Sequence, residues 1–360
     1  KMLAKPIVLD NGSSAIKAGF AEDSEPRVEF EFLNVDTLGG RHAQDGARAG
    51  QPVPLRRPVM VHGIVRKWEA LEACWQEVFD MLNVKPQDYP VFVSEAPLNP
   101  ITHKEKLVET LFEFFNVPSA QVVHSGALAL FGTGSSTGLV IEVGDGVAQT
   151  VPLYNSYLMF NAVNRRNFGG RDLTDYLSKL LKETVGFDAG VDLKPVSDMK
   201  GSLALKNNVA DQKTFELPDG KVVDCGQFSK CPEALFQPSL LDLDGSEERP
   251  GIHQLAYDSI SKCARDIQRD ITKNIVLAGG SMLFPGMVEK VEEELKALLP
   301  RVTVRASLLK NPRHATFKGG SVVASMPDAQ KSFMTKAEYE ENGAAYIHEK
   351  SISLTQPPRR

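Results

Sequence analysis

Two segments of the chain share one pattern of apolar and polar positions. Residues 7–20 read IVLDNGSSAIKAGF, and residues 139–154 read LVIEVGDGVAQTVPLY. Each has an apolar run, a short turn rich in Gly and Asp, and a second apolar run, which is typical of a β-hairpin. Backbone N–H groups at a glycine-containing tip of this kind can approach an anion. The repetition therefore predicts a duplicated domain whose two hairpin tips hold the phosphates of one nucleotide.

Helical and strand patterns alternate along the rest of the chain. Apolar residues recur at helical spacing from Trp68, and Thr102-His103-Lys104-Glu105 has the pattern of a capping box that opens a second helix. Further helices are predicted at 170–181, at 252–271 and at 285–299, strands at 91–97 and 275–280, and a hairpin turn at Pro218-Asp219-Gly220. Strands that alternate with helices indicate an α/β fold.

The length of 360 residues favours two domains. We expect a first lobe over 1–134, with a reduced small subdomain at about 30–62, and a second lobe over 135–314, with a small subdomain at about 171–250. The C-terminal segment, about 315–360, is expected to return to the first lobe.

Composition and charge mainly exclude certain classes of protein and of site. The chain is 42% hydrophobic and 24% charged, as is usual for a globular protein, and its net charge of −5 argues against direct nucleic-acid binding. No apolar run approaches about 18 residues, and the start KMLAKPIVLD lacks the apolar stretch of a secretory signal, so we expect no membrane span and no leader. The cysteines at 74, 225, 231 and 263 fit no metal spacing and predict reduced thiols.

The first hairpin tip has the residue types of a phosphate site. Gly12 allows a tight backbone, and Ser13 and Ser14 offer N–H and hydroxyl donors. Lys17 on the following strand is placed to reach a phosphate as a point charge, and Asp10 to hold Mg²⁺ through water. Taken alone, the segment also fits an ordinary Asn-Gly hairpin with a solvated lysine.

The second tip and a later loop have related chemistry. Gly144-Asp145-Gly146 repeats the glycine and the carboxylate, so Asp145 is the second candidate for the metal and the terminal phosphate. Ala278-Gly279-Gly280-Ser281 follows a predicted strand, and its small residues would let the backbone lie against an adenosine. Leu283 and Phe284 are placed to close over a base. Alternatively, residues 278–281 form only a tight strand–helix turn, and Leu283 and Phe284 are ordinary core residues.

Long stretches of the sequence resemble actin and the actin-related proteins, within the larger group shared with Hsp70 and sugar kinases. They run from end to end in the family's order and include DNG and KAGF at 10–20, HGIV at 62–65, EAPLNP at 95–100, GDGV at 144–147, GRDLTDYL at 170–177, ELPDG at 216–220, CPEALFQPS at 231–239 and KGGSVVAS at 318–325. The resemblance implies the actin-like ATPase fold, with two α/β lobes around a cleft for ATP or ADP with Mg²⁺.

The resemblance also implies roles for individual residues. It places phosphate contacts at Gly12, Ser13, Ser14, Lys17, Asp145, Gly146 and Val147, and carboxylates near the metal at Asp10 and Asp145. The remaining predicted cofactor-binding residues are Gly144, Gly170, Lys200, Gly279, Gly280, Ser281, Leu283, Phe284 and Arg313. It further implies a partner groove lined by Phe131, Gly134, Tyr157, Val323 and Met326.

Two departures from actin concern hydrolysis. Actin has a glutamine at the position of Ser125, and that glutamine orients the attacking water, which a serine is too short to reach. The nearby histidine of the family pattern is Gln149, our candidate for holding the water instead. Since phosphoryl transfer depends on positioning, we predict slow or absent hydrolysis.

Further departures concern nucleoside binding and polymerisation. Ser14 replaces a glycine of the actin hairpin, and Gly201 and Ser197 replace a glutamate and an arginine, which weakens the contacts to adenosine. The segment between Arg27 and His62 is about ten residues shorter than in actin, so a filament contact is reduced. We therefore expect poor homopolymer formation.

The favoured function is a divergent actin-related protein that binds ATP or ADP with Mg²⁺ and acts as a structural subunit of a cytoskeletal or other multiprotein assembly. Its expected partners are other proteins, including actin or actin-related subunits, and not nucleic acid or membrane. The expected location is the cytoplasm and cytoskeleton, with the cilium, axoneme and nucleus also compatible. The alternatives are a filament-forming ATPase like conventional actin and a metabolite kinase of the same superfamily.

Overall fold

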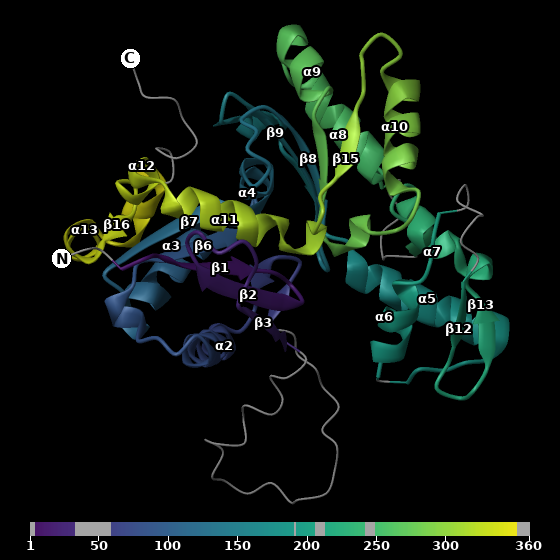
Figure 1. Cartoon of the computed structure of the whole chain (residues 1–360), viewed down its shortest axis with the longest axis horizontal. Coiled ribbons are helices and arrows are strands. Elements are labelled where there is room, and N and C mark those ends of the chain that lie inside the picture. The colour runs from purple at the N-terminus through teal and green to yellow at the C-terminus, as the bar shows by residue number, and fades with distance from the viewer. Residues whose placement is uncertain (1–3, 33–58, 191, 206–212, 242–248, 351–360) are drawn as a thin grey trace, which may run out of the picture. The chain divides into compact units, whose positions relative to one another are not determined.

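The chain folds as two compact units. The computed structural model describes residues 4–32, 59–190, 192–205, 213–241 and 249–350, and most of the predicted small subdomain at about 30–62 lies outside these ranges (Figure 1). The first unit comprises Lys1–Gly134 with Thr316–Arg360, and the second comprises Ser135–Ala315. The first unit is therefore built from both ends of the sequence.

A six-stranded mixed sheet organises the first unit, in the order β16-β7-β6-β1-β2-β3. Its strands are β1 (Ile7–Asn11), β2 (Ala15–Phe20), β3 (Val28–Glu31), β6 (Val91–Glu95), β7 (Ser119–His124) and β16 (Met334–Thr335). β1 and β2 form the predicted antiparallel hairpin, and β1, β6 and β7 run parallel. The carboxyl ends of β1, β6 and β7 therefore lie along one edge of the sheet.

The second unit repeats this arrangement, with the strand order β10-β9-β8-β14-β15 and β11 paired to β9. Its strands are β8 (Gly138–Val143), β9 (Ala148–Tyr154), β10 (Tyr157–Leu158), β11 (Asn164–Arg166), β14 (Ile275–Ala278) and β15 (Ala306–Leu308). Here β8 and β9 form the hairpin, and β8, β14 and β15 run parallel. Each sheet thus has a hairpin followed by two parallel strands, which confirms the α/β fold class and the duplication.

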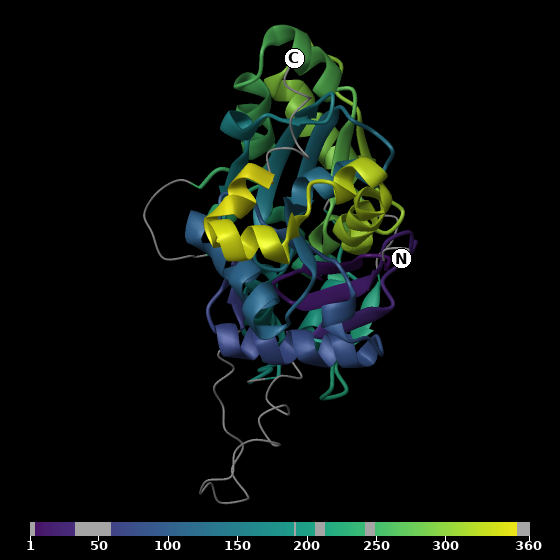
Figure 2. The same cartoon turned by 90° about the vertical axis from the view of Figure 1, so that its left-hand side faces the viewer.

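Helices cover the first unit's sheet. They are α2 (Trp68–Met81), α3 (Ile101–Glu109), the π-helical turn η4 (Thr110–Phe114), α4 (Ser125–Phe131), α11 (Ala315–Ser325), α12 (Pro327–Gln330) and α13 (Lys336–Asn342). Figure 1 shows α2 and α11 on opposite sides of this sheet, and Figure 2 shows the same layering after a 90° turn. A short hairpin, β4 (Met60–Val61) with β5 (Ile64–Val65), precedes α2.

The start of α3 differs from the prediction. The helix begins at Ile101, its N-cap is Pro100, and no side chain caps it, so the capping box predicted at Thr102 is wrong. The Pro100 carbonyl accepts the first hydrogen bond of the turn, from the His103 N–H at 2.9 Å. Glu105, which would have closed the box, instead lies 3.0 Å from His348. The helix therefore begins before the predicted cap, and the Pro100 carbonyl closes its first turn.

The helices of the second unit include one break that the sequence pattern did not indicate. They are α5 (Gly170–Val185), α6 (Lys194–Lys200), α7 (Lys230–Glu233), α8 (Ile252–Ser261), α9 (Arg265–Ile271) and α10 (Met287–Leu298), with a predicted hairpin of β12 (Thr214–Glu216) and β13 (Val222–Asp224). The single helix predicted over 252–271 is wrong, because Ala264 has an extended backbone between α8 and α9. The Gln268 side chain donates to the Cys263 carbonyl at 2.8 Å and stabilises this break.

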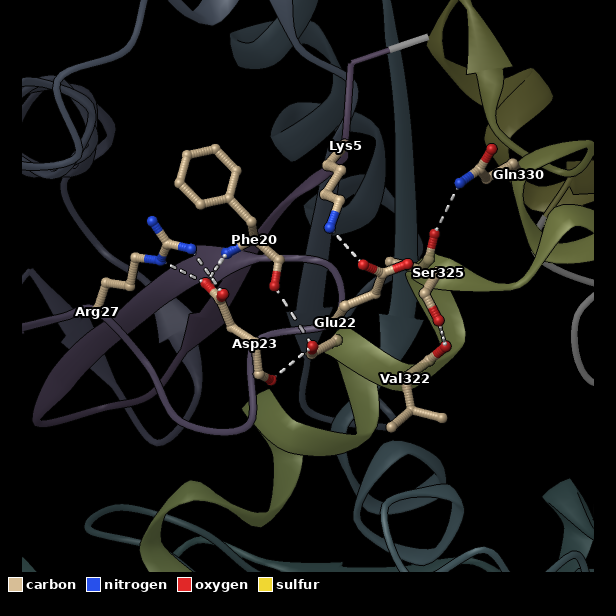
Figure 3. Close-up of polar contacts among 10 residues, drawn as sticks. Lys5, Phe20, Glu22, Asp23, Arg27, Val322, Ser325 and Gln330 are labelled. Atoms are coloured by element: carbon tan, nitrogen blue, oxygen red, sulfur yellow. Dashed lines mark hydrogen bonds and ion pairs between the residues drawn. The ribbon is translucent and has the colours of Figure 1, made fainter. Parts of the chain in front are cut away.

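Helix α11 fastens the C-terminal segment to the first hairpin. The Ser321 hydroxyl donates to the carbonyls of Phe20 and Asp23, at 3.3 and 2.7 Å, and the Glu22 N–H donates to the Ser321 carbonyl. Figure 3 shows the turn after β2, where the Asp23 carboxylate pairs with Arg27 and accepts from the Phe20 N–H. These contacts hold the end of β2 that lies opposite the glycine tip of the hairpin.

Candidate functional site

Asp10 and Lys17 face each other just below the tip of the first hairpin. They are register partners of β1 and β2, with 3.6 Å between Lys17 Nζ and Asp10 Oδ2, and both are largely buried. The Ser94 hydroxyl, from β6, donates to Asp10 Oδ1 at 2.8 Å. A Cβ atom on Gly12 would lie 2.8 Å from the Ala15 carbonyl oxygen and 3.8 Å from Lys17 Nζ. The lysine ammonium group therefore lies beside the glycine at the tip.

Asn11 and Ser13 complete the first tip. Asn11 Oδ1 accepts from the Trp75 indole at 3.1 Å, while its Nδ2 is buried and has no hydrogen-bond partner among the described residues. Ser13 Oγ accepts from the Gly63 N–H at 3.0 Å, and Ser14 is exposed. A buried amide donor without a partner is unusual and indicates a group that is satisfied by a ligand or water.

Three backbone segments converge in the second unit. The Gly144 carbonyl, at the β8–β9 turn, accepts from the Gly170 N–H at 2.9 Å and from the Ser281 hydroxyl at 3.2 Å. A Cβ atom would lie 2.6 Å from the Gly144 oxygen if added to Gly169, and 2.2 Å from the Val143 oxygen if added to Gly279. Only glycine fits these approaches, which is why the hairpin turn, the start of α5 and the loop after β14 meet here.

Charged side chains surround this convergence. Arg171 lies 2.9 Å from the Asp145 carboxylate, and its N–H donates to the Asp145 carbonyl. Lys200 Nζ donates to the Gly170 carbonyl at 2.6 Å and to the Thr174 hydroxyl at 2.7 Å. Burial lowers the pKa of Lys200, and Arg313 lowers it further, while Asp145 acts in the opposite direction. Two cations near one carboxylate and several glycines give a site suited to a phosphate or a ribose.

Gln149 is the second residue of β9, close to the turn, and its side-chain nitrogen has a partner. Its side chain is almost fully buried on β9, and its amide donates to the carboxylate of Glu142, its register partner on β8. Our sequence reasoning did not select Glu142. The spacing in the sequence could have identified it, because Glu142 and Gln149 are seven positions apart, as are Asp10 and Lys17. In the structure, the two residues of each pair lie opposite each other next to a hairpin tip. By internal duplication, Glu142 is thus the counterpart of Asp10.

The remaining predicted residues differ in accessibility. Leu283 is 48% exposed, whereas Phe284 is 7% exposed and packs in the second unit's core. Val147 is buried beside the turn, and Gly280 lies against the Arg313 side chain, 3.4 Å from its Cγ to an added Cβ. The predicted cofactor residues therefore form two sets, the first-hairpin set at 10–17 and a second-unit set around Gly144, Gly170 and Gly279.

The predicted groove residues are divided between the units. Val323 is 6% exposed and belongs to the core of the first unit, while Met326 is 47% exposed. Gly134 has a φ of +78° with nothing within 4 Å of an added Cβ. Tyr157 lies on β10 of the second unit. The exposed neighbour of Val323 on α11 is Val322.

The described part of the chain lacks both a metal-binding cluster and a membrane-spanning helix. It contains no cluster of three or more His, Cys, Asp or Glu side chains arranged to bind a metal. None of its helices is both long and apolar enough to span a bilayer.

Comparison with known protein families identifies a family model that matches this chain. The family model described as Actin matches residues 3–209 and 195–352, which together span nearly the whole chain. The match agrees with the duplicated sheets and with the two glycine hairpins. The chain belongs to the actin family.

Proposed function

We propose that this protein binds ATP or ADP with Mg²⁺, and that it serves as a structural subunit of a multiprotein assembly with slow or absent hydrolysis. Members of the actin family generally bind this nucleotide and metal. The observation that carries the proposal is the repeated hairpin: a carboxylate opposite a nitrogen donor, at the same register, next to a glycine tip in both units.

The residues present fit a nucleotide. In the first-hairpin set, Lys17 and the backbone around Gly12 supply positive charge and N–H donors for phosphates. In the second-unit set, we assign the phosphate role to the backbone of 145–147 and the nucleoside role to Lys200 and Arg313. These assignments account for the concentration of glycines.

The carboxylates fit a metal held through water. Asp10 is engaged by Ser94 and Lys17, and Asp145 by Arg171, so neither is free to coordinate Mg²⁺ with both oxygens. Mg²⁺ keeps several waters and usually binds through a few carboxylates and the substrate's phosphates, without an all-protein cage. We propose that Asp10 and Asp145 bind those waters, and that the ion neutralises phosphate charge.

Nucleotide binding is tested directly by release and by affinity. We expect purified protein to release ATP or ADP on heating, and Lys17→Met to weaken ATP affinity about 10- to 100-fold, because a charge-assisted contact is lost. The matched control is Lys5→Met, which removes an exposed lysine on the same unit. Protein without nucleotide and without Mg²⁺-dependent ATP binding would refute the proposal.

We infer slow hydrolysis from Ser125 and Gln149, the residues at the two positions that would orient the attacking water. Ser125, the first residue of α4, carries a short side chain and is 9% exposed, and Gln149 is almost fully buried with its Nε2 donating to Glu142. Loss of a positioning group costs about 10²–10⁴ in rate. Phosphate release should therefore be slower than that of conventional actin by about this factor. Turnover equal to that of actin would overturn this part of the proposal.

The structural role is tested by sedimentation. We expect the protein to stay in the supernatant after addition of Mg²⁺ and salt, conditions under which conventional actin pellets. A pellet of ordered filaments would favour the alternative of a filament-forming ATPase. Affinity capture followed by mass spectrometry would identify the assembly.

A further inference from the structure

The Ser94 hydroxyl group joins two polar groups at the end of β1. It donates to Asp10 Oδ1 at 2.8 Å and accepts from the Asn11 N–H at 3.1 Å. A backbone N–H only donates and an ionised carboxylate only accepts, so the neighbours of the hydroxyl group fix both of its roles. Ser94 is 2% exposed, so bulk water does not compete for either contact. One side chain therefore holds both the Asp10 carboxylate and the backbone of the next residue.

The strand register places Ser94 beside Asp10. β1 and β6 are parallel, with Leu9 opposite Val93, so the residue after each of these lies at the carboxyl end of its strand. β6 is paired on its other side with β7, where Ser94 is opposite Val123. A side chain on a strand that has a neighbour on both sides is positioned more precisely than one on a loop. The Ser94 hydroxyl group is therefore a rigid support for the carboxylate.

The other carboxylate oxygen is held less directly. Lys17 Nζ lies 3.6 Å from Asp10 Oδ2, which is longer than the usual N–H···O distance of about 2.7–3.2 Å. In the proposed function, this ammonium group also faces the phosphates, so two anions share its attraction. The contact between Ser94 and Asp10 does not depend on the ligand in this way.

The second unit shows that this type of sheet does not require the hydroxyl group. β14 lies beside β8 as β6 lies beside β1, and its register places Ala278 opposite Glu142. Glu142 is the counterpart of Asp10, and its carboxylate accepts from Gln149 on β9. An alanine therefore occupies, in the second unit, the place that Ser94 has in the first. The hydroxyl group is a feature of the Asp10 site and not of the duplicated architecture.

We propose that Ser94 is a positioning residue for the Asp10 carboxylate, and through it for Mg²⁺ bound by way of water. The inference rests on the proposed function, which assigns the metal's water shell to this carboxylate. Mg²⁺ demands a near-ideal octahedral geometry, so a carboxylate that binds its waters has to present its oxygens in a fixed direction. Hydrogen bonds to the carboxylate fix that direction, and loss of such a partner typically lowers metal affinity about 10- to 100-fold.

The experiment measures the Mg²⁺ affinity of the ATP complex of the full-length protein, and the ATP affinity in EDTA. We expect Ser94→Ala to lower the Mg²⁺ affinity about 10- to 100-fold and to leave the ATP affinity in EDTA within about threefold of the wild type. A merely structural role of Ser94 would weaken ATP binding in EDTA as well. Ser94→Thr keeps the hydroxyl group on a side chain suited to a strand and should restore most of the Mg²⁺ affinity.

The matched control is Ser332→Ala. Ser332 is another buried serine of the first unit, and its hydroxyl group donates to the Ala329 carbonyl. We expect this variant to keep the Mg²⁺ affinity of the wild type. The proposal is overturned by wild-type Mg²⁺ affinity in Ser94→Ala, by an equal loss in Ser332→Ala, or by an equal loss in Ser94→Thr. If Ser94→Ala does not fold, Ser94→Cys keeps the volume with a weaker donor and must lower the Mg²⁺ affinity.

Hydrogen exchange of the ligand-free protein examines the contact without nucleotide. The protection factor of the Asn11 amide should fall about three- to tenfold in Ser94→Ala, because one hydrogen bond is lost, and should stay close to the wild type in Ser94→Thr. The reference amide is Ile275, which donates to Arg305 in the second unit. Unchanged Asn11 protection in Ser94→Ala would show that Ser94 does not hold this end of β1.

The two measurements distinguish the failure of this inference from the failure of the proposed function. A wild-type protein that does not bind ATP with Mg²⁺ would refute the proposed function, and the metal role of Ser94 with it, while Asn11 exchange still decides whether Ser94 holds β1. A wild-type protein that binds ATP with Mg²⁺, together with a Ser94→Ala variant of equal Mg²⁺ affinity, would refute only the role of Ser94.

Discussion

At the scale of single residues, the buried group around Glu95 dominates the electrostatics of the first unit. The Glu95 side chain is 3% exposed and lies 3.0 Å from Lys104. Burial acts to raise the pKa of Glu95, but Lys104 and His103 outweigh it and lower the pKa to about 2. Burial, with repulsion from Lys104, lowers the pKa of His124 to about 4. Folding therefore favours an ionised Glu95 and a neutral His124.

We expect acid to destabilise the protein in two pH windows. Between the ordinary pKa of 6.5 and the folded value of about 4, the unfolded chain binds more protons at His124, so stability falls as the pH falls through that range. The contribution of Glu95 is present above its ordinary pKa of 4.5 and is lost as the pH falls towards 2. Urea midpoints measured across this range would show both losses.

A matched pair of histidine variants tests whether His124 causes the loss of stability between pH 6.5 and 4. His124→Gln should remove much of the loss between pH 6.5 and 4, whereas His348→Gln, on the partly exposed pair with Glu105, should not. Equal losses in the two variants would contradict the assignment.

Removing the buried carboxylate should also destabilise the first unit at neutral pH. Glu95→Gln takes the carboxylate partner from Lys104, and breaking a buried pair typically costs about 3–5 kcal/mol of unfolding free energy. The control is Glu341→Gln on the exposed face of α13, for which we expect a change within about 0.5 kcal/mol. Urea unfolding at neutral pH measures both. A Glu95→Gln variant as stable as the control would refute the structural importance of this pair.

At the scale of elements, close backbone approaches bring together the loops of the second unit. Gly279 follows β14 with a φ of +89°, and an added Cβ would lie 2.2 Å from the Val143 carbonyl oxygen at the end of β8. These two strands are parallel neighbours, so the glycine lets their carboxyl ends meet at the β8–β9 turn. The arrangement of the charged side chains around this turn therefore depends on a contact between loops.

Two glycine variants distinguish the cost of backbone strain from the cost of the close approach to Val143. Gly220 has a φ of +81° in the β12–β13 turn, with nothing within 4 Å of an added Cβ, so Gly220→Ala should cost about 1–2 kcal/mol. Gly279→Ala adds the clash with Val143 and should cost on the order of 3 kcal/mol or more. Thermal unfolding followed by circular dichroism compares them. Equal shifts in the melting temperature would show that the clash relaxes at no cost.

At the scale of the whole molecule, the first unit is discontinuous in sequence and the second is not. One core of the first unit joins Val8 and Phe92, from the N-terminal part, to Phe317 and Phe333, from the C-terminal part. Gly319 of α11 lies so close to the backbone of α4 that an added Cβ would be 1.7 Å from the Leu128 carbonyl oxygen. The first unit therefore needs residues 316–350 to complete its core.

A truncation after Ala315 should unfold the first unit and leave the second folded. Both tryptophans of the chain, Trp68 and Trp75, lie in the first unit, so their emission should shift to the red while the second unit keeps its resistance to proteolysis. The comparison is a truncation after Lys350, which keeps every first-unit residue that the structure describes. Native tryptophan emission after the shorter truncation would contradict the dependence.

Local chemistry in the sequence was sufficient for much of the fold. The helix from Trp68, the two hairpins and the strand into Glu95 follow from apolar periodicity and glycine turns, which act over a few residues. The duplication was visible because both hairpins carry the same pattern. The sequence also holds the equal spacing of Asp10 to Lys17 and of Glu142 to Gln149, although its meaning needed the register.

The sequence by itself thus determined the elements, their duplication and the residue types at both hairpin tips. Only the tertiary structure decided that α8 ends before Cys263 and that His103 binds Val65. The reason is physical. A turn or a helix face is set by neighbours along the chain, whereas the partner of a buried charge or an unpaired backbone group is set by whichever distant segment packs against it.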